Sequence, residues 1–304
     1  ANDQTRSVLK FFDGLKDRKE KRVLSGQFTD FGNGSNLRII EEIHDRTGHW
    51  VGMIGVDYAD FPRGDVTYEA PNRTAIAYAK AGGIIHVMAH MYNPANPKKG
   101  GLRDKGVDLD ELLKEGSDTH QRWMEQLDKI AAGLEQLQEA GVVAIWRPFH
   151  EMNGGWFWWG DKDPESFKRV WRHMFRYFTQ TKKLNNLLWA YGPNHGKNTT
   201  AFYPGDEYVD IIGLDAYTDH IDPEHIRGYA ELVKIKKPFG FTEYGPHGSS
   251  NPPGDYDYRR LMEGIKRHFP ETVFFMSWNA KWSLARNLHV REMLEDPWVV
   301  GRER

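Results

Sequence analysis

Short apolar runs recur along the chain, and each is followed by a polar loop and then by a stretch with helical spacing of apolar residues. Most of these runs lack polar alternation, which is typical of parallel strands covered on both faces. Eight such strands are predicted: Val23 to Gln27, Trp50 to Tyr58, Gly83 to His90, Val142 to Glu151, Leu187 to Pro193, Val209 to Tyr217, Pro238 to Gly245 and Val273 to Ala280.

Helices are predicted between the strands, where apolar residues repeat every three to four positions. They are Leu37 to Thr47, Arg73 to Lys80, Ser117 to Ala140, Glu165 to Lys182, Pro223 to Lys236, Tyr256 to His268 and Val290 to Glu295. The connection from Asn198 to Tyr208 is the weakest helix, because Pro204 and Gly205 interrupt it. Eight strand–helix units are typical of an α/β protein of the (β/α)8 TIM barrel class. Since nothing marks a linker, we expect one catalytic domain over residues 1–304.

Composition excludes several classes of protein. Lys and Arg number 41 and Asp and Glu 43, a net charge of -2 with no long run of one sign, which disfavours nucleic-acid and anionic-membrane partners. No apolar stretch approaches the roughly 20 residues that span a bilayer. Cysteine is absent, so disulfides and a Cys nucleophile are excluded. Aromatic residues make up 13% of the chain, including 11 Trp, and such rings also stack on sugars.

No cofactor or metal is expected. No predicted strand is followed by a Gly-rich phosphate-binding motif, which argues against nucleotide chemistry. The 13 His residues suggest a metal-dependent hydrolase as one alternative, but neither HExxH nor an HxH at the end of the first strand occurs.

Polar residues gather where the predicted strands end, and in a barrel these ends meet at the rim that carries active sites. They are Asp57, Tyr58, His90, His150, Glu151, Asn194, His195, Asp215, Tyr217, Glu243, Tyr244, Trp278 and Asn279. Each alone is unremarkable in a loop, but their repetition at one rim predicts a site.

Glu151 is the first of two candidate catalytic carboxylates. It ends the predicted fourth strand and precedes Trp156, Trp158 and Trp159. Desolvation by such surroundings would raise the pKa of its carboxyl group, as a general acid requires. The alternative is a structural Glu that caps a helix or pairs with Arg147.

Glu243 is the second candidate and the only acidic residue in the seventh predicted strand. Strands four and seven lie three apart around an eight-stranded ring, so Glu151 and Glu243 would face each other. Two carboxylates that flank one bond are the requirement of glycoside hydrolysis. Their separation, about 5 to 5.5 Å in retaining and 6.5 to 9.5 Å in inverting enzymes, is not visible in a sequence.

The chain resembles glycoside hydrolase family 26 over essentially its whole length. The resemblance is carried by RPFHEMNGGWFWWG from Arg147 to Gly160, by FTEYG from Phe241 to Gly245 and by IIGLDAY from Ile211 to Tyr217. It implies a retaining (β/α)8 glycosidase, most of whose characterised relatives are endo-β-1,4-mannanases acting on mannan, galactomannan or glucomannan.

The resemblance also implies residue roles. Glu151 would be the acid/base and Glu243 the nucleophile, held by Tyr217. Substrate contacts would come from His90, His150, Trp156, Tyr217 and Trp278, with supporting roles for Arg147, Asp57, Tyr58, Asn194 and Asp215. Trp158 and Trp159 either line the site or pack in the core, and His86 is expected deeper in the barrel.

One feature departs from the family pattern. Some of its mannanases use a Trp shortly after the third strand, whereas no Trp lies between Tyr92 and Gln121 here. The loop from Asn96 to Leu112 is charged instead, so the residues of the glycone-side subsites stay open.

Other functions remain to be weighed. The same fold and mechanism could serve β-1,3-1,4-glucan or β-1,3-xylan, and a carbohydrate-binding protein without turnover would need the aromatic residues alone. We expect a monomer, secreted because mannan is too large to enter a cell. The start at Ala1 fits either a processed mature end or a trimmed one.

Overall fold

Eight parallel strands form a closed ring in the computed structural model, which describes residues 1–61, 63–248 and 253–302. Each strand pairs with the next in chain order, and β1 pairs with β10 to close the ring. The eight are β1 (Val23–Phe31), β2 (Met53–Asp57), β5 (Ile84–Met88), β6 (Ala144–Arg147), β7 (Leu187–Tyr191), β8 (Ile211–Tyr217), β9 (Phe239–Gly245) and β10 (Thr272–Ser277). The predicted (β/α)8 barrel is confirmed.

Three short strands supplement the ring. β3 (Ala59–Asp60) and β4 (Asp65–Val66) form a small antiparallel hairpin after β2, and β11 (Val299–Val300) pairs with the start of β1. The hairpin belongs to the loop that leaves β2 at the carboxyl end of the barrel, the face on which TIM-barrel sites are built.

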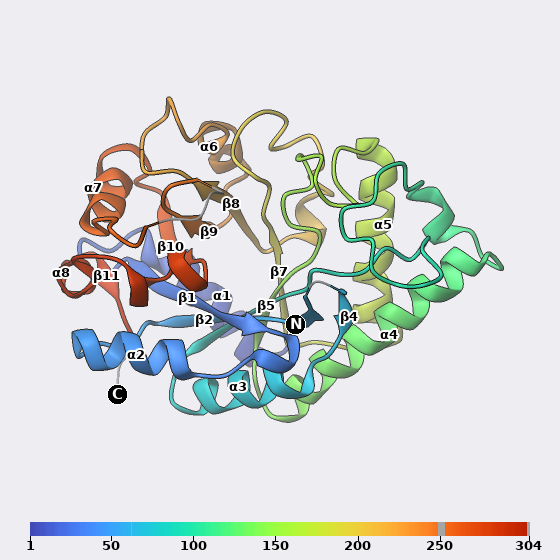
Figure 1. Ribbon diagram of the computed structural model, residues 1–304, viewed down its shortest axis with the longest axis horizontal. Helices are drawn as coiled ribbons and strands as arrows, with labels where there is room; N and C mark the ends of the chain where they lie inside the picture. Colours follow the sequence, from blue (N-terminus) through green and yellow to red (C-terminus); the bar gives the residue numbers. More distant parts are fainter. Residues whose placement is uncertain (62, 249–252, 303–304) are drawn as a thin grey trace.

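Helices surround the strands, with α4 and α5 together along one side of the barrel (Figure 1). Ser117 and Asp163 cap α4 and α5 by accepting hydrogen bonds from backbone N–H groups. The helices are α1 (Asp3–Leu15), α2 (Arg38–Thr47), α3 (Glu69–Lys80), α4 (Asp118–Glu139), α5 (Pro164–Arg176), α6 (Tyr229–Leu232), α7 (Arg259–His268) and α8 (Val290–Leu294). None of them, in the part of the chain described, is long and apolar enough to cross a membrane.

The helix α1 was not predicted from the sequence. It lies at the amino end of the barrel, where Phe12 and Leu15 are buried among residues from the first halves of the strands. The ring of Phe12 lies 5.7 Å from that of Phe274 on β10. The helix therefore closes the end of the barrel opposite the loops that follow the strands.

Two predicted helices are wrong or too long. Between Asn198 and Tyr208 the structure forms only a 3-10 turn, Asp206–Tyr208, because Pro204 and Gly205 break the backbone pattern. The helix predicted for 223–236 shrinks to α6 and a following 3-10 turn, since Gly228 before it adopts a φ of 104°.

Candidate active site

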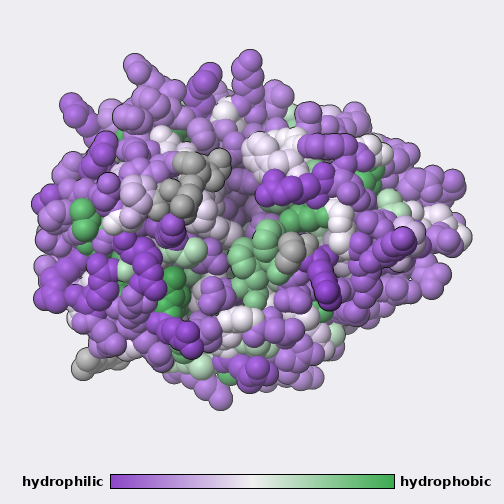
Figure 2. Space-filling model, in the orientation of Figure 1, coloured by the Kyte–Doolittle hydropathy of each residue, from purple (hydrophilic) through white to green (hydrophobic). Residues whose placement is uncertain are grey.

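A cavity of about 690 Å³ opens at the carboxyl ends of the strands. Figure 2 shows a hollow near the centre of this face, with hydrophobic residues gathered on its rim. The lining consists of Phe31, Phe61, His90, Arg103, His150, Glu151, Trp156, Phe157, Asn194, His195, Tyr217, Glu243, Trp278, Asn279 and Trp282. Both candidate carboxylates thus face the same cavity.

Glu151 sits on an unusual stretch of backbone rather than on a strand. β6 ends at Arg147, and beyond it Phe149 and Glu151 adopt φ values of 52° and 56°. Residues other than glycine rarely adopt this left-handed conformation, which costs about 1 to 3 kcal/mol. The prediction of a strand through Glu151 is therefore wrong, and the tight turn delivers the carboxyl group to the cavity wall.

The surroundings of Glu151 favour its protonated form. The Trp156 indole donates a hydrogen bond of 2.6 Å to Glu151 Oε2, and the side chain is otherwise nearly buried. Burial, together with the nearby charges of Glu243 and Asp215, raises the pKa of Glu151 well above its usual range. Gly154 lets the Trp156 ring approach, because a Cβ there would lie 2.2 Å from that ring.

Both carboxylate oxygens of Glu243 accept a hydrogen bond. Tyr217 donates its hydroxyl at 2.8 Å to Glu243 Oε2, and Arg147 Nη2 donates to Glu243 Oε1. Burial alone would lower the pKa of Arg147, but the charges of Asp215 and Glu243 raise it, so the guanidinium stays charged. Its other nitrogen, Nη1, donates to Asp215 at 2.6 Å. A fixed cation therefore lies against Glu243.

The separation of the carboxylates bears on the stereochemical course. One oxygen each of Glu151, Asp215 and Glu243 lies within 4.8 Å of the others. This limit lies below the roughly 6.5 to 9.5 Å between the carboxyl groups of inverting glycosidases, and it agrees with the shorter separation of roughly 5 to 5.5 Å in retaining ones. The same oxygens could in principle hold a cation, but the guanidinium of Arg147 already binds two of the three carboxylates.

A second group with metal-ligand chemistry lies in the loop after β8. His220, Asp222 and His225 place their donor atoms within 4.8 Å of one another, and both His residues are exposed. The Asp222 carboxylate already accepts a hydrogen bond of 2.8 Å from His225 Nδ1. None of the three lines the cavity.

Three side chains form a hydrogen-bonded chain, and two of them, His90 and His150, line the cavity. Asp57 accepts from His90 Nδ1 at 2.5 Å, and His90 Nε2 lies 3.1 Å from His150 Nε2. Burial lowers the pKa of His150 well below its usual value, so this imidazole is neutral. The contacts from Asp57 through His90 to His150 hold both imidazole rings in place.

Most predicted site residues converge, and some do not. Arg147 and Asp215 support Glu243 from below, and Asn194 lines the cavity itself. The prediction for Tyr58 is wrong, because strand alternation turns it toward the helices, where its hydroxyl donates to Asn72. His86, Trp158 and Trp159 are fully buried, and the Trp159 indole donates to the His150 carbonyl.

Four aromatic residues and one Arg of the lining were missed in the sequence: Phe31, Phe61, Arg103, Phe157 and Trp282. Phe157 belongs to the Trp-rich segment and Phe31 ends a strand, which are signals that sequence analysis can use. Phe61 and Arg103 lie in loops without a motif, so only the fold reveals them.

Comparison with known proteins identifies the family of this chain. Residues 1–304 match the family profile described as Glycosyl hydrolase family 26. The chain belongs to this family. Over 99% of its length it is 35% identical to the Mannan endo-1,4-beta-mannosidase A and B of Caldalkalibacillus mannanilyticus, of which it spans 61%, and to the Mannan endo-1,4-beta-mannosidase of Bacillus subtilis, of which it spans 87%.

Solved structures agree with this membership. The Bacillus subtilis mannanase BCman superposes with a TM-score of 0.92 at 34% identity, with 99% of this chain and 93% of that chain covered. Family 26 membership confirms the predicted class, a retaining glycosidase on a (β/α)8 barrel.

Proposed function

We propose that this protein is an endo-β-1,4-mannanase that hydrolyses the backbones of mannan, galactomannan and glucomannan. The observation that carries the proposal is the pair Glu151 and Glu243, which face one cavity from opposite electrostatic surroundings. The substrate comes from the relatives, which are named for the endo-hydrolysis of mannan.

The first step of the reaction forms a covalent intermediate. Glu243, ionised beside Arg147 and oriented by Tyr217, attacks the anomeric carbon with a carboxylate oxygen. The bond to the glycosidic oxygen breaks, and Glu151 transfers its proton to that oxygen as it leaves. Trp156, bonded to Glu151, would line the leaving-group side of the cavity.

The second step restores the enzyme. Glu151, now a carboxylate, takes a proton from water while the water oxygen attacks the anomeric carbon and displaces Glu243. Two inversions give overall retention. We assign the platform under the reacting sugar to Trp278, and sugar contacts to His90 and His150 at the rim.

Release of reducing sugar from galactomannan, barley glucan and xylan tests the substrate. We expect turnover on galactomannan to exceed that on the other two, with a mixture of oligosaccharide lengths because the action is endo. A preference for barley glucan or xylan would replace the substrate and keep the mechanism. Binding of galactomannan without turnover on any polymer would instead indicate a carbohydrate-binding protein.

We further propose that the protein is a monomer that acts outside the cell, since its polymeric substrate cannot enter one. Light scattering at assay concentration measures the first. The second is measured by the share of mannanase activity found in culture medium.

A further inference from the structure

An aromatic surface extends the cavity beyond the reacting centre. Phe31 ends β1, and Phe61 follows β3 in the connection between β2 and α3. Their rings stack at 5.2 Å between centroids with an angle of 29° between planes. Phe31 covers one face of Phe61, and the rest of the Phe61 ring borders the cavity.

Phe61 is unusually open for its size. It is 47% exposed, and among the large apolar side chains of residues 1–61, 63–248 and 253–302 only Leu288, at 46%, is comparable. A single exposed apolar residue needs no explanation. Phe61, however, belongs to the lining of the cavity in which two carboxylates meet, whereas Leu288 does not.

The two rings continue the surface that Trp278 begins. The Phe31 ring lies 5.8 Å from Trp278 and 5.4 Å from His90, and the Phe61 ring lies 6.3 Å from His90. The strands that precede these residues, β10, β1, β2 and β5, are consecutive neighbours in the ring. The surface thus runs along one side of the cavity, from the proposed platform outward.

Trp156 and Glu151 mark the leaving-group side of the cavity. They follow β6, and the indole of Trp156 is bonded to the acid that protonates the leaving group. No ring contact joins Phe31 or Phe61 to Trp156 within the described part of the chain. Because Trp278 lies under the sugar to be cleaved and Trp156 beside the leaving group, the Phe31–Phe61 surface lies on the glycone side.

We propose that Phe61, backed by Phe31, is the platform for a sugar beyond the reacting one on the glycone side. Apolar C–H faces of a pyranose pack on an aromatic ring as other apolar groups do. The ligand class is a β-1,4-linked hexose chain. The inference rests on the proposed function.

Activated aryl β-glycosides of one, two and three mannose units test the platform, since each added unit extends only the glycone side. For Phe61→Ala we expect kcat/KM to fall about tenfold on the longer glycosides, equivalent to about 1.4 kcal/mol, and to stay unchanged on the single mannoside. Phe61→Trp should restore the loss. Leu288→Ala, which removes an equally exposed apolar side chain outside the cavity, is the matched control.

Two results would overturn the inference. One is a Phe61→Ala variant that matches Leu288→Ala on every glycoside, and the other is an equal loss on all three, which would assign Phe61 to the reacting centre. A wild-type protein without turnover on any mannoside or mannan would contradict the proposed function instead, so the two failures are distinguishable.

Discussion

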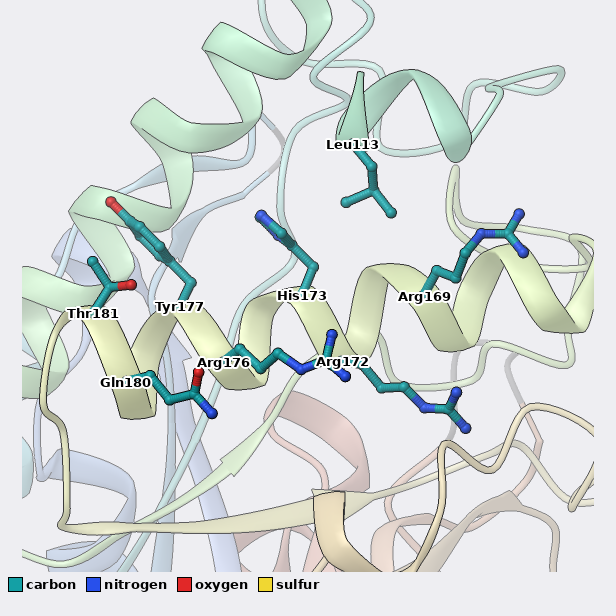
Figure 3. A pocket seen from close by; sticks show the side chains of 8 residues that line it. All are labelled: Leu113, Arg169, Arg172, His173, Arg176, Tyr177, Gln180 and Thr181. Atoms are coloured by element: carbon teal, nitrogen blue, oxygen red, sulfur yellow. The ribbon is translucent and has the colours of Figure 1, made fainter. Parts of the chain in front are cut away.

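The cavity at the barrel mouth and a pocket on the outer surface both hold clusters of charged side chains, and they differ in how those charges are assembled. The cavity at the barrel mouth measures about 690 Å³, and a pocket on the outer surface about 440 Å³. All side chains of the outer pocket except Leu113 come from α5 and the π-turn that continues it to Thr181 (Figure 3).

The charges of the outer pocket stay in contact with water. Arg169 pairs with Asp110 at 2.7 Å while both side chains are about half exposed, and Arg172 donates to the carbonyl of Pro204. At the barrel mouth, Arg147, Asp215 and Glu243 come from three different strands and are buried together. Convergence from separate elements, rather than a concave shape, therefore distinguishes a reactive site, because burial makes each charge depend on its neighbours.

The largest effect is expected from replacing the nucleophile. Glu243→Ala should lower turnover of mannan on the order of 10⁴-fold, because no other group can form the covalent intermediate. Reducing-sugar release measures the loss, and calorimetry with a manno-oligosaccharide should show that binding largely survives. Glu243→Gln, which keeps the side-chain shape, controls for misfolding, and undiminished turnover in either variant would contradict the assignment.

Replacing the acid should have a smaller and substrate-dependent effect. Glu151→Ala is expected to lose about 10² to 10⁴-fold on mannan, the range of general acid catalysis. Aryl mannosides with good leaving groups need little protonation, so their rate of intermediate formation should change much less. Steady-state and burst kinetics on both substrates measure the difference. Equal losses on both would count against the acid role.

The rate of mannan hydrolysis should depend on pH through Glu151, which lies in the barrel cavity and not in the outer pocket. Glu151 must carry a proton, and its pKa is raised by burial and by its neighbouring carboxylates above the ordinary value of about 4.3. Activity should therefore persist well above that pH and fall as pH rises through the raised pKa of Glu151. A profile of kcat/KM against pH measures this alkaline limb, and a limb that survives in Glu151→Gln would exclude Glu151 as its cause.

The smallest effect is expected in the outer pocket. Arg169→Ala removes an ion pair between two half-exposed side chains, so the free energy of unfolding should hardly change. Turnover on mannan should match the wild type, because no group of this pocket reaches the carboxylates. Urea unfolding and reducing-sugar assays measure the two quantities. A large loss of turnover would mean that the outer surface participates in the reaction.

The sequence predicts the barrel well where burial alone determines structure. The run of β8 from Ile211 to Tyr217 is buried almost throughout, and its apolar residues identify it without any partner. The helix expected for 223–236 fails because Gly228 and the residues before it favour a turn. The sequence pattern does not predict the terminal helix α1, because only two of its apolar side chains, Phe12 and Leu15, are buried.

Site residues that stand in a distinctive segment of the sequence can be predicted, whereas contacts between distant segments cannot. Glu151 and Glu243 stand in distinctive segments, so both are found. The contact of His90 with His150 joins residues 60 positions apart, and the stacking of Phe61 on Phe31 depends on how a hairpin folds back. The prediction for Tyr58 fails for a simpler reason: it follows Asp57 directly, and adjacent residues along a strand face opposite sides of the sheet.

The left-handed backbone at Glu151 sets the stability of this enzyme against its catalysis. Glycine adopts such a φ without penalty, so the residue that would suit the backbone best at position 151 is one that removes the proton donor. The protein thus keeps a strained backbone conformation at the centre of its active site, at a cost in folding stability. A Glu151→Gly form would be free of that strain and slow on mannan, which would suit it to capturing an intact polysaccharide in the cavity.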